Sequence, residues 1–255
     1  MDTWINIIAA FALVNMIWVI FQATGHQFYF KLGSETREGV YIGLPGIMGQ
    51  RVFQGILCAV ATPILLKKSL WFTPLIIAGL YFSKSSTAIA AALAGALFLF
   101  HIRYKYLIPF ILIGLFFIAK DVNFEQFKIT VYSQTLPLIE NHWLGQGLGA
   151  FHQAHVVEDN AKMWFREAHN EYYQLYFEYG RIGVAFLLWL FSEMAFRFFR
   201  HRKDKTIQIL SACFLAFLIS CSGQPVMHVV RIAMVGVVLT ALIYARSDQL
   251  KGEIQ

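Results

Sequence analysis

Apolar residues in this chain come in long blocks that short polar stretches separate. Helices that cross a lipid bilayer typically show this pattern, because all their faces meet lipid or other helices. We count eight such blocks, at Trp4 to Ala23, Val52 to Leu66, Leu70 to Ser83, Ser86 to Phe100, Tyr106 to Ala119, Ile182 to Phe199, Ile207 to Cys221, and Val229 to Tyr244. The pattern predicts an all-α fold, a polytopic transmembrane helical bundle of about eight spans.

Composition agrees with a membrane protein and excludes some other classes. Of the 255 residues, 58% are hydrophobic and 14% are charged, whereas soluble domains carry about 25% charged residues. The net charge of +6 comes from basic residues in short loops between apolar blocks, where they act as topology signals. We therefore expect the lipid bilayer as a partner and no nucleic acid. Three cysteines fall inside apolar blocks and are expected to be buried, namely Cys58, Cys213 and Cys221.

The basic residues predict an orientation. Lys67, Lys68, the loop His101 to Lys105, the run Arg197 to Lys205, and Arg246 all fall on one side if every block crosses once. Positive loops mark the cytoplasm, so both termini are expected there, and the first block is expected to be a retained span. The chain then divides into residues 1–119 with spans one to five, an outer loop subdomain at 120–181, and residues 182–255 with spans six to eight.

The outer segment 120–181 is the main polar interruption, and it has three parts. Phe124, Phe127, Val131 and Leu138 recur at nearly helical spacing and predict an amphipathic interfacial helix. Next come three glycines in five residues, which indicate a turn that something approaches closely: Gly145, Gly147 and Gly149. The third part, Asp159 to Tyr179, lacks Gly and Pro and is predicted to be helical, with Asp159 or Asn160 as its cap.

On that predicted helix, Arg166, His169 and Tyr173 are spaced i, i+3, i+7 and would share one face. A histidine beside an arginine suggests a general base next to an anion anchor. The alternative is a solvated interfacial helix with an aromatic belt, and spacing alone favours that alternative. Histidines are frequent here, but no carboxylate or cysteine completes a metal-ligand spacing, so we predict no metal site.

Two further cations are candidate site residues. Lys84 sits at the tip of the short hairpin Leu70 to Phe100, and Arg231 begins the last block beside the turn Gly223-Gln224-Pro225. Blocks of about 15 residues measure roughly 22 Å, short of a bilayer core of about 30 Å. The outer turns would then line a recess, unless the helices extend into their polar flanks. For both cations the alternative is snorkelling to the interface.

The run Ala168-His169-Asn170-Glu171-Tyr172-Tyr173-Gln174-Leu175-Tyr176-Phe177-Glu178-Tyr179-Gly180-Arg181-Ile182-Gly183 resembles the signature of the bacterial O-antigen ligase and O-antigen polymerase superfamily. That signature is His, then Asn, Ser or Gln, nine residues, Gly, two residues, then Gly, Thr or Tyr. All four positions match. Ser83 to Ala88 resembles the family's Ser-x-Ser-Arg segment, with Lys84 and Ser86 where arginine is commoner nearby, and Leu144 to Gly149 resembles its Gly-x-Gly turn.

The resemblance covers about Arg37 to Ala245, and relative to the family the chain is expected to lack the N-terminal spans. It implies a bacterial inner-membrane protein with a periplasmic active face and a periplasmic, helical subdomain between spans five and six. The donor would be a glycan on undecaprenyl pyrophosphate, and the acceptor a hydroxyl on lipid A core or on another glycan. No metal and no cofactor are implied.

The resemblance also implies residue roles. His169 would be the general base of an inverting transfer, and Asn170 would orient the imidazole or a sugar hydroxyl. Gly180 and Gly183 would be structural. The pyrophosphate clamp would be drawn from five cations, Arg37, Arg51, Lys84, Arg166 and Arg231. The alternatives are a polysaccharide polymerase or a transferase to pilin, and an inactive protein that only binds or moves a lipid-linked glycan.

Overall fold

The computed structural model describes residues 2–24, 51–100, 131–138, 143–153, 155–158, 161–164, 168, 170–223 and 230–253. Its long helices are α1 (Asp2–Ala23), α2 (Arg51–Lys68), α3 (Thr73–Ser83), α4 (Ser86–Leu99), α7 (Glu171–Arg200), α8 (Lys205–Cys221) and α9 (Val230–Gly252). Residues 131–138 are also helical. The 3-10 turns are η2 (Leu70–Phe72) and η3 (Ala150–Gln153), and the strands are β1 (His155–Glu158) and β2 (Ala161–Trp164). Seven of the eight predicted blocks coincide with these helices, and Tyr106 to Ala119 lies outside the described residues.

Local sequence explains where several helices begin and end. The Ser85 hydroxyl accepts the backbone N–H of Ala88 and caps α4, and the Asp204 carboxylate accepts that of Ile207 and caps α8. Such side chains satisfy N–H groups that have no partner in the first turn of a helix. Lys84 ends α3 in the left-handed region, with φ of 50°.

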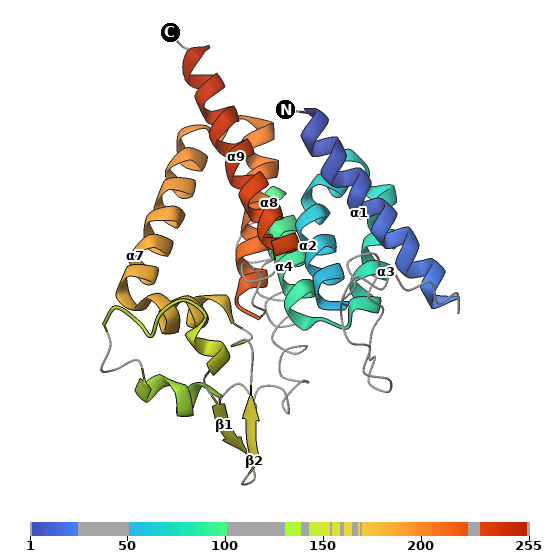
Figure 1. The fold of residues 1–255 in the computed structure, drawn as a ribbon. Coiled ribbons are helices and arrows are strands. Elements are labelled where there is room, and N and C mark those ends of the chain that lie inside the picture. The colour runs from blue at the N-terminus through green and yellow to red at the C-terminus, as the bar shows by residue number, and fades with distance from the viewer. Residues whose placement is uncertain are drawn as a thin grey trace.

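Helices α1, α2 and α3 run in alternating directions. Lys68, at the end of α2, donates a hydrogen bond to Asn6, near the start of α1. Gln54, early in α2, donates from Nε2 to the carbonyl of Gly79, late in α3, at 3.0 Å. Figure 1 shows the result: both termini lie at one end of the bundle, and β1 and β2 lie at the other. We call these the termini end and the hairpin end.

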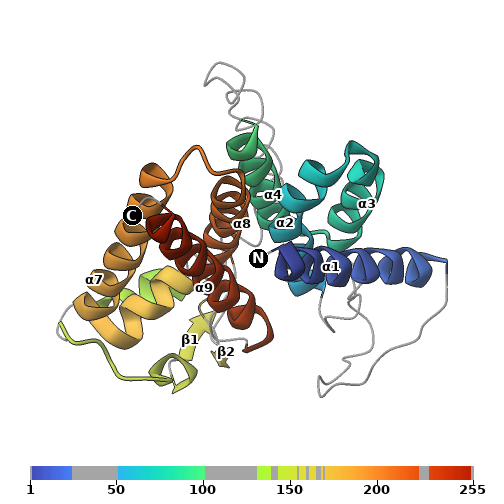
Figure 2. The same cartoon turned by 90° about the horizontal axis from the view of Figure 1, so that it is seen from above.

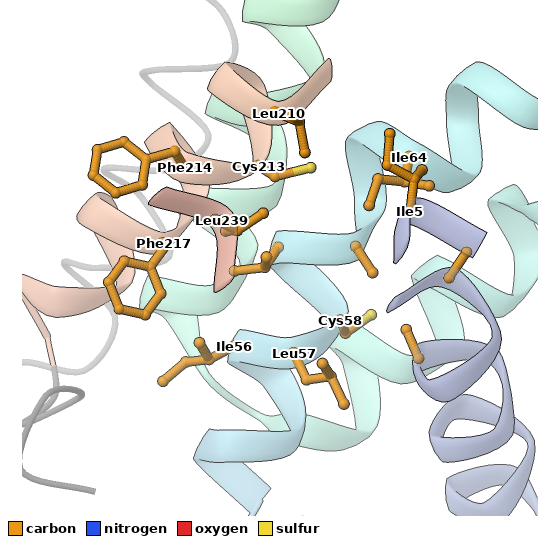
Figure 3. Packing of buried hydrophobic residues seen from close by; sticks show 14 of the residues in the cluster. Ile5, Ile56, Leu57, Cys58, Ile64, Leu210, Cys213, Phe214, Phe217 and Leu239 are labelled. Carbon is orange, nitrogen blue, oxygen red and sulfur yellow. The ribbon is translucent and has the colours of Figure 1, made fainter. Parts of the chain in front are cut away.

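The core of the bundle lies between α2, α4 and α8, and small residues let these helices approach closely. A Cβ on Gly95 of α4 would meet the Ala212 carbonyl of α8 and the Pro63 ring of α2, each at 3.0 Å. Larger side chains fill the space on the other side of α2 and α8, including Cys58 and Cys213 (Figure 3). All three cysteines are buried, which confirms the prediction from their apolar surroundings.

Three helices are long and apolar enough to cross a membrane by length and composition: Thr3–Ala23 in α1, Glu171–Arg200 in α7 and Ile232–Gly252 in α9. Helix α7 stands at the edge of the bundle (Figures 1 and 2). Its outward side chains are apolar and more than half exposed, namely Ile182, Phe186, Trp189 and Phe196. Such a surface suits lipid rather than water. The fold is therefore a helical bundle of membrane character, and the count of eight spans stays a prediction.

The predicted helix from Asp159 to Tyr179 is wrong at the described residues before Glu171 and correct from Glu171 to Tyr179. β1 and β2 pair antiparallel with Glu158 opposite Ala161, so Asp159 and Asn160 lie between two strands in the sequence and do not cap a helix there. The helix begins only at Glu171. β-Branched and aromatic residues such as Val156, Val157 and Trp164 favour strands, and the absence of Gly and Pro was a poor guide to helix.

Candidate functional site

The candidate site is the segment that leads into α7 at the hairpin end. Asn170 has extended backbone angles, φ of −154° and ψ of 114°, and its side-chain oxygen accepts the backbone N–H of Tyr173 at 3.1 Å. Asn170 is therefore the N-cap of α7. The cap uses only the oxygen of the side-chain amide. The structure thus gives Asn170 a structural role that the sequence analysis did not foresee.

The backbone of the residue before His169 is held at both its N–H and its carbonyl. Ala168 is buried; its N–H donates to Gln174 Oε1 at 3.0 Å, and its carbonyl accepts from the Tyr132 hydroxyl at 3.2 Å. His169 itself lies outside the described residues. Of its two neighbours, Ala168 is held by the side chains of Tyr132 and Gln174, and Asn170 by its own capping bond to the Tyr173 N–H.

A row of buried polar side chains runs along one face of α7. Glu171, Gln174 and Glu178 are spaced i, i+3, i+7, and none is more than 1% exposed. Gln174 Nε2 donates to Glu178 Oε1 at 3.1 Å. Burying a carboxylate costs free energy unless the group is hydrogen-bonded or paired with a cation. The sequence analysis missed this row, although the signal was present as polar residues at helical spacing within an aromatic run.

Helix α7 is kinked at Gly180, and the glycine loop locks onto the kink. Gly180 has φ of 57° and ψ of −141°, a region that is essentially restricted to glycine. A Cβ there would meet the Trp143 carbonyl at 2.2 Å, and a Cβ on Gly145 would meet the Glu178 carbonyl at 2.4 Å. No side chain fits between the two backbones. The close approach expected at the glycine turn is thus an approach by α7 itself.

Backbone hydrogen bonds close this lock. Gln146 N–H donates to the Phe177 carbonyl, Gly147 N–H donates to the Glu178 carbonyl, and both bonds measure 2.9 Å. Arg181 N–H donates to the Trp143 carbonyl at 3.0 Å. The carbonyls before a kink lose their helical partners, and here the loop supplies replacement donors. The other two loop glycines, Gly147 and Gly149, also have positive φ, of 99° and 74°.

An aromatic cluster surrounds the segment and forms a second, small core. The Phe151 ring packs edge-on against Phe177, with centroids 5.1 Å apart, and the Tyr132 and Tyr173 rings lie 4.4 Å apart. The Tyr173 and Thr135 hydroxyls are 2.7 Å apart and share a hydrogen bond. This cluster joins the helix at residues 131–138 and η3 to the start of α7.

One tyrosine ties the segment to the main bundle. The Tyr172 hydroxyl donates to the Leu218 carbonyl, near the end of α8, at 2.6 Å. The end of α8 in turn abuts the start of α4, because a Cβ on Gly223 would fall 2.1 Å from Thr87 Oγ1. The α3–α4 hairpin, the end of α8 and the start of α7 therefore belong to the same end of the molecule (Figure 1).

The five predicted cations divide into three groups. Lys84 is exposed at the hairpin tip, and its ammonium lies 3.5 Å from the centroid of the Tyr81 ring. Arg51 is the first residue of α2 and Arg231 is the second of α9. Arg37 and Arg166 lie outside the described residues. No described contact joins Lys84 to the start of α7.

The predicted shared face of Arg166, His169 and Tyr173 is wrong, because the backbone is not helical at Ala168 or at Asn170 and α7 starts at Glu171. Tyr173 is instead part of the aromatic cluster. Gly183 lies just after the kink, where a Cβ would meet the Leu175 carbonyl at 2.8 Å. Among the described residues, no group of three His, Cys, Asp or Glu side chains could hold a metal ion.

The comparisons with known proteins do not place the chain. No protein family, curated protein or solved structure matches it. The class that the fold defines is a helical bundle with three candidate membrane spans, and the finer assignment depends on the site.

Proposed function

We propose that the chain is a membrane glycosyltransferase of the O-antigen ligase type, which moves a glycan from undecaprenyl pyrophosphate to an acceptor hydroxyl at the hairpin end. One observation carries the proposal. Within the motif that runs from His169 to Gly183, Asn170 caps the start of α7 and Gly180 forms its kink, and the glycine loop at 143–149 packs against that kink. A chance match to the motif would not require such an arrangement.

The proposed reaction needs one base and several cations. The acceptor hydroxyl passes its proton to the His169 imidazole, and its oxygen attacks the anomeric carbon from the side opposite the pyrophosphate. The bond from that carbon to the pyrophosphate oxygen breaks, and undecaprenyl pyrophosphate leaves with the electron pair. The product is inverted at the anomeric carbon. Negative charge develops on the pyrophosphate as it leaves, and cations beside it stabilise the transition state. The residues proposed to supply these cations are Arg37, Arg51, Lys84, Arg166 and Arg231.

The rigidity of the segment supports a catalytic role. A general base must stand within hydrogen-bond reach of the proton it takes, and small displacements cost large factors in rate. The backbone on either side of His169 is held by Tyr132, Gln174 and the Asn170 cap.

The test is a His169→Ala variant, assayed for glycan transfer from a lipid-linked donor in membranes. We expect transfer to fall by about 10²- to 10⁴-fold, the usual contribution of a general base, at unchanged membrane levels. His101→Ala is the matched control, because His101 lies in a basic loop between two apolar blocks, on the side expected to face the cytoplasm. Transfer that survives His169→Ala would sink the proposal and favour a protein that only binds or moves lipid-linked glycans.

The same assay separates the sibling activities by their product. A ligase attaches the glycan to lipid A core, a polymerase lengthens the glycan on its lipid carrier, and a pilin transferase modifies protein. Offering the three acceptors in separate reactions identifies the substrate class without changing the catalytic test.

A further inference from the structure

The turn between α7 and α8 forms a pocket at the termini end, far along α7 from the candidate site. The end of α9 closes it from the side, and Figure 2 shows the turn beside the C-terminus. The pocket is lined by Phe199, Arg200, His201, Arg202, Lys203, Asp204, Leu250 and Glu253. Basic residues in such turns serve as topology signals, but that role does not require a pocket.

Some charged side chains in this pocket form ion pairs with other described residues, and others do not. Asp204 and Glu253 both reach Arg246, at 2.7 and 3.7 Å. Burial opposes ionisation of Asp204, but hydrogen bonds from Arg246 and from the Ile207 N–H hold its pKa below the usual value. Within the described part of the chain, Arg200, Arg202 and Lys203 form no ion pair. The pocket therefore presents three cations whose nearby carboxylates are already engaged.

One wall holds a buried polar atom without a partner. His201 is 8% exposed, and its Nε2 makes no hydrogen bond to any described residue. Buried polar groups are normally hydrogen-bonded, and an exception requires an explanation. Burial and the adjacent Arg200 lower the pKa of His201, so the ring is neutral near pH 7, and a neutral imidazole can present one N–H to an acceptor. A phosphate oxygen is such an acceptor.

Apolar surface continues from the cations. Phe199, which lines the pocket, and Phe196, one turn earlier on α7, are 66% and 59% exposed. They extend the apolar outer face of α7 up to the basic turn. A free phosphate has no use for this surface, whereas a phospholipid would lay its acyl chains along it and its headgroup on the turn.

We propose that this pocket binds the headgroup of an acidic phospholipid from the leaflet at the termini end. Arg200, Arg202 and Lys203 contact the phosphate, the His201 ring donates to one of its oxygens, and Phe199 and Phe196 pack against the acyl chains. Basic pockets between helices recognise acidic headgroups in this manner. The inference does not depend on the glycan-transfer proposal.

The test uses the full chain purified in a neutral detergent, with phosphatidylglycerol, phosphatidylcholine or inorganic phosphate added, and native mass spectrometry to count bound lipid. We expect phosphatidylglycerol to be retained and phosphatidylcholine to be lost. The double variant Arg200→Gln/Arg202→Gln should bind phosphatidylglycerol on the order of tenfold more weakly, because each basic residue near an acidic surface contributes a several-fold factor. Both side chains are exposed, so the variant should fold.

The matched control is Lys67→Gln/Lys205→Gln, which removes two exposed cations outside the pocket lining. This control should bind phosphatidylglycerol like the parent chain. Equal weakening in both double variants would mean attraction to bulk charge and would overturn the site. Binding of inorganic phosphate that competes fully with the lipid would also overturn it, in favour of a free-anion site. Retention of phosphatidylcholine equal to that of phosphatidylglycerol would refute the headgroup specificity.

Discussion

At the scale of single residues, the oxygen and the nitrogen of the Asn170 side-chain amide have different hydrogen-bonding roles. Its oxygen accepts the Tyr173 N–H and caps α7, while its amide nitrogen takes no part in the cap. The family resemblance implies a second role, orientation of the imidazole or of a sugar hydroxyl, and while the oxygen caps α7 the nitrogen remains to donate to either group. The structural and catalytic roles of Asn170 are therefore separable by substitution.

We predict that Asn170→Asp and Asn170→Ala differ in stability but not in activity. Aspartate keeps the capping oxygen and adds favourable charge at a helix start, whereas alanine loses the cap at a cost of about 1 kcal/mol. Both lose the N–H donor, so glycan transfer should fall in both. Thermal unfolding in detergent measures the first effect and the transfer assay the second. Parent-like activity in Asn170→Asp would leave Asn170 as a cap alone.

At this scale sequence reasoning marked candidate residues but not their contacts. Spacing marked His169 and Gly145, and the family resemblance marked Asn170 and Gly180. Neither could show that Gln174 accepts the Ala168 N–H or that Tyr132 donates to the Ala168 carbonyl, because these contacts join residues up to 36 positions apart. Burial of a polar residue depends on which elements cover it, and residue type alone does not reveal this.

At the scale of elements, the kink and the glycine loop behave as one unit. The loop donates two backbone N–H groups to carbonyls of α7 and accepts one N–H from Arg181, and there is no room for a Cβ at Gly145 or at Gly180. The first turns of α7 thus depend on the loop for their geometry. The aromatic cluster depends on it too, since Phe177 belongs to both.

We predict that Gly180→Ala destabilises the chain, while Gly252→Ala has little effect. The backbone angles at Gly180 cost a residue with a side chain on the order of 1–3 kcal/mol, and the Cβ would also overlap the Trp143 carbonyl. A Cβ on Gly252 meets nothing within 4 Å. Thermal unfolding compares the two variants, and limited proteolysis near residues 143–153 reports release of the loop. Equal midpoints would contradict the lock.

Element prediction succeeded where one force dominated. Continuous apolar blocks gave α1, α2, α4 and α8 to within a few residues, because only a helix satisfies its own backbone in an apolar setting. Helix α9 continues past the predicted end at Tyr244, to Gly252. The segment before α7 failed because it has no dominant hydrophobic period. There, pairing of β1 with β2 outweighed helix propensity. The absence of glycine and proline, on which the helix prediction rested, gives no information about strand pairing.

At the scale of the whole molecule, many basic residues lie at one end. Arg197, Arg200, Arg202, Lys203 and Lys68 gather at the termini end, where α2 and α7 finish (Figure 1). The cytoplasmic placement of both termini was predicted from these same residues and stays a prediction. The up-and-down order of the described helices could be predicted from the blocks, but the close packing of α2, α4 and α8 could not, because it depends on which small residues face each other.

We predict opposite accessibility for two single cysteines. Lys84→Cys should react with a membrane-impermeant maleimide in intact cells with a permeabilised outer membrane, whereas Lys67→Cys should react only after lysis. Both lysines are exposed, and the three native cysteines are buried, so the parent chain provides an unlabelled background. Labelling of Lys67→Cys before lysis would reverse the orientation, and equal labelling of both would argue against a spanning bundle.

The position of the kink in α7 also indicates how deep each part of the helix would lie in a bilayer. From Arg181 to Arg200 the helix is about 30 Å long, which is the thickness of a bilayer's hydrocarbon layer. With Arg200 at one polar boundary, Gly180 falls at the other, and the first nine residues of α7 lie at the level of the phosphates. A polyprenyl carrier keeps its pyrophosphate at that same level. The proposed donor would therefore meet the His169 segment by sideways diffusion within its leaflet, without being lifted into water.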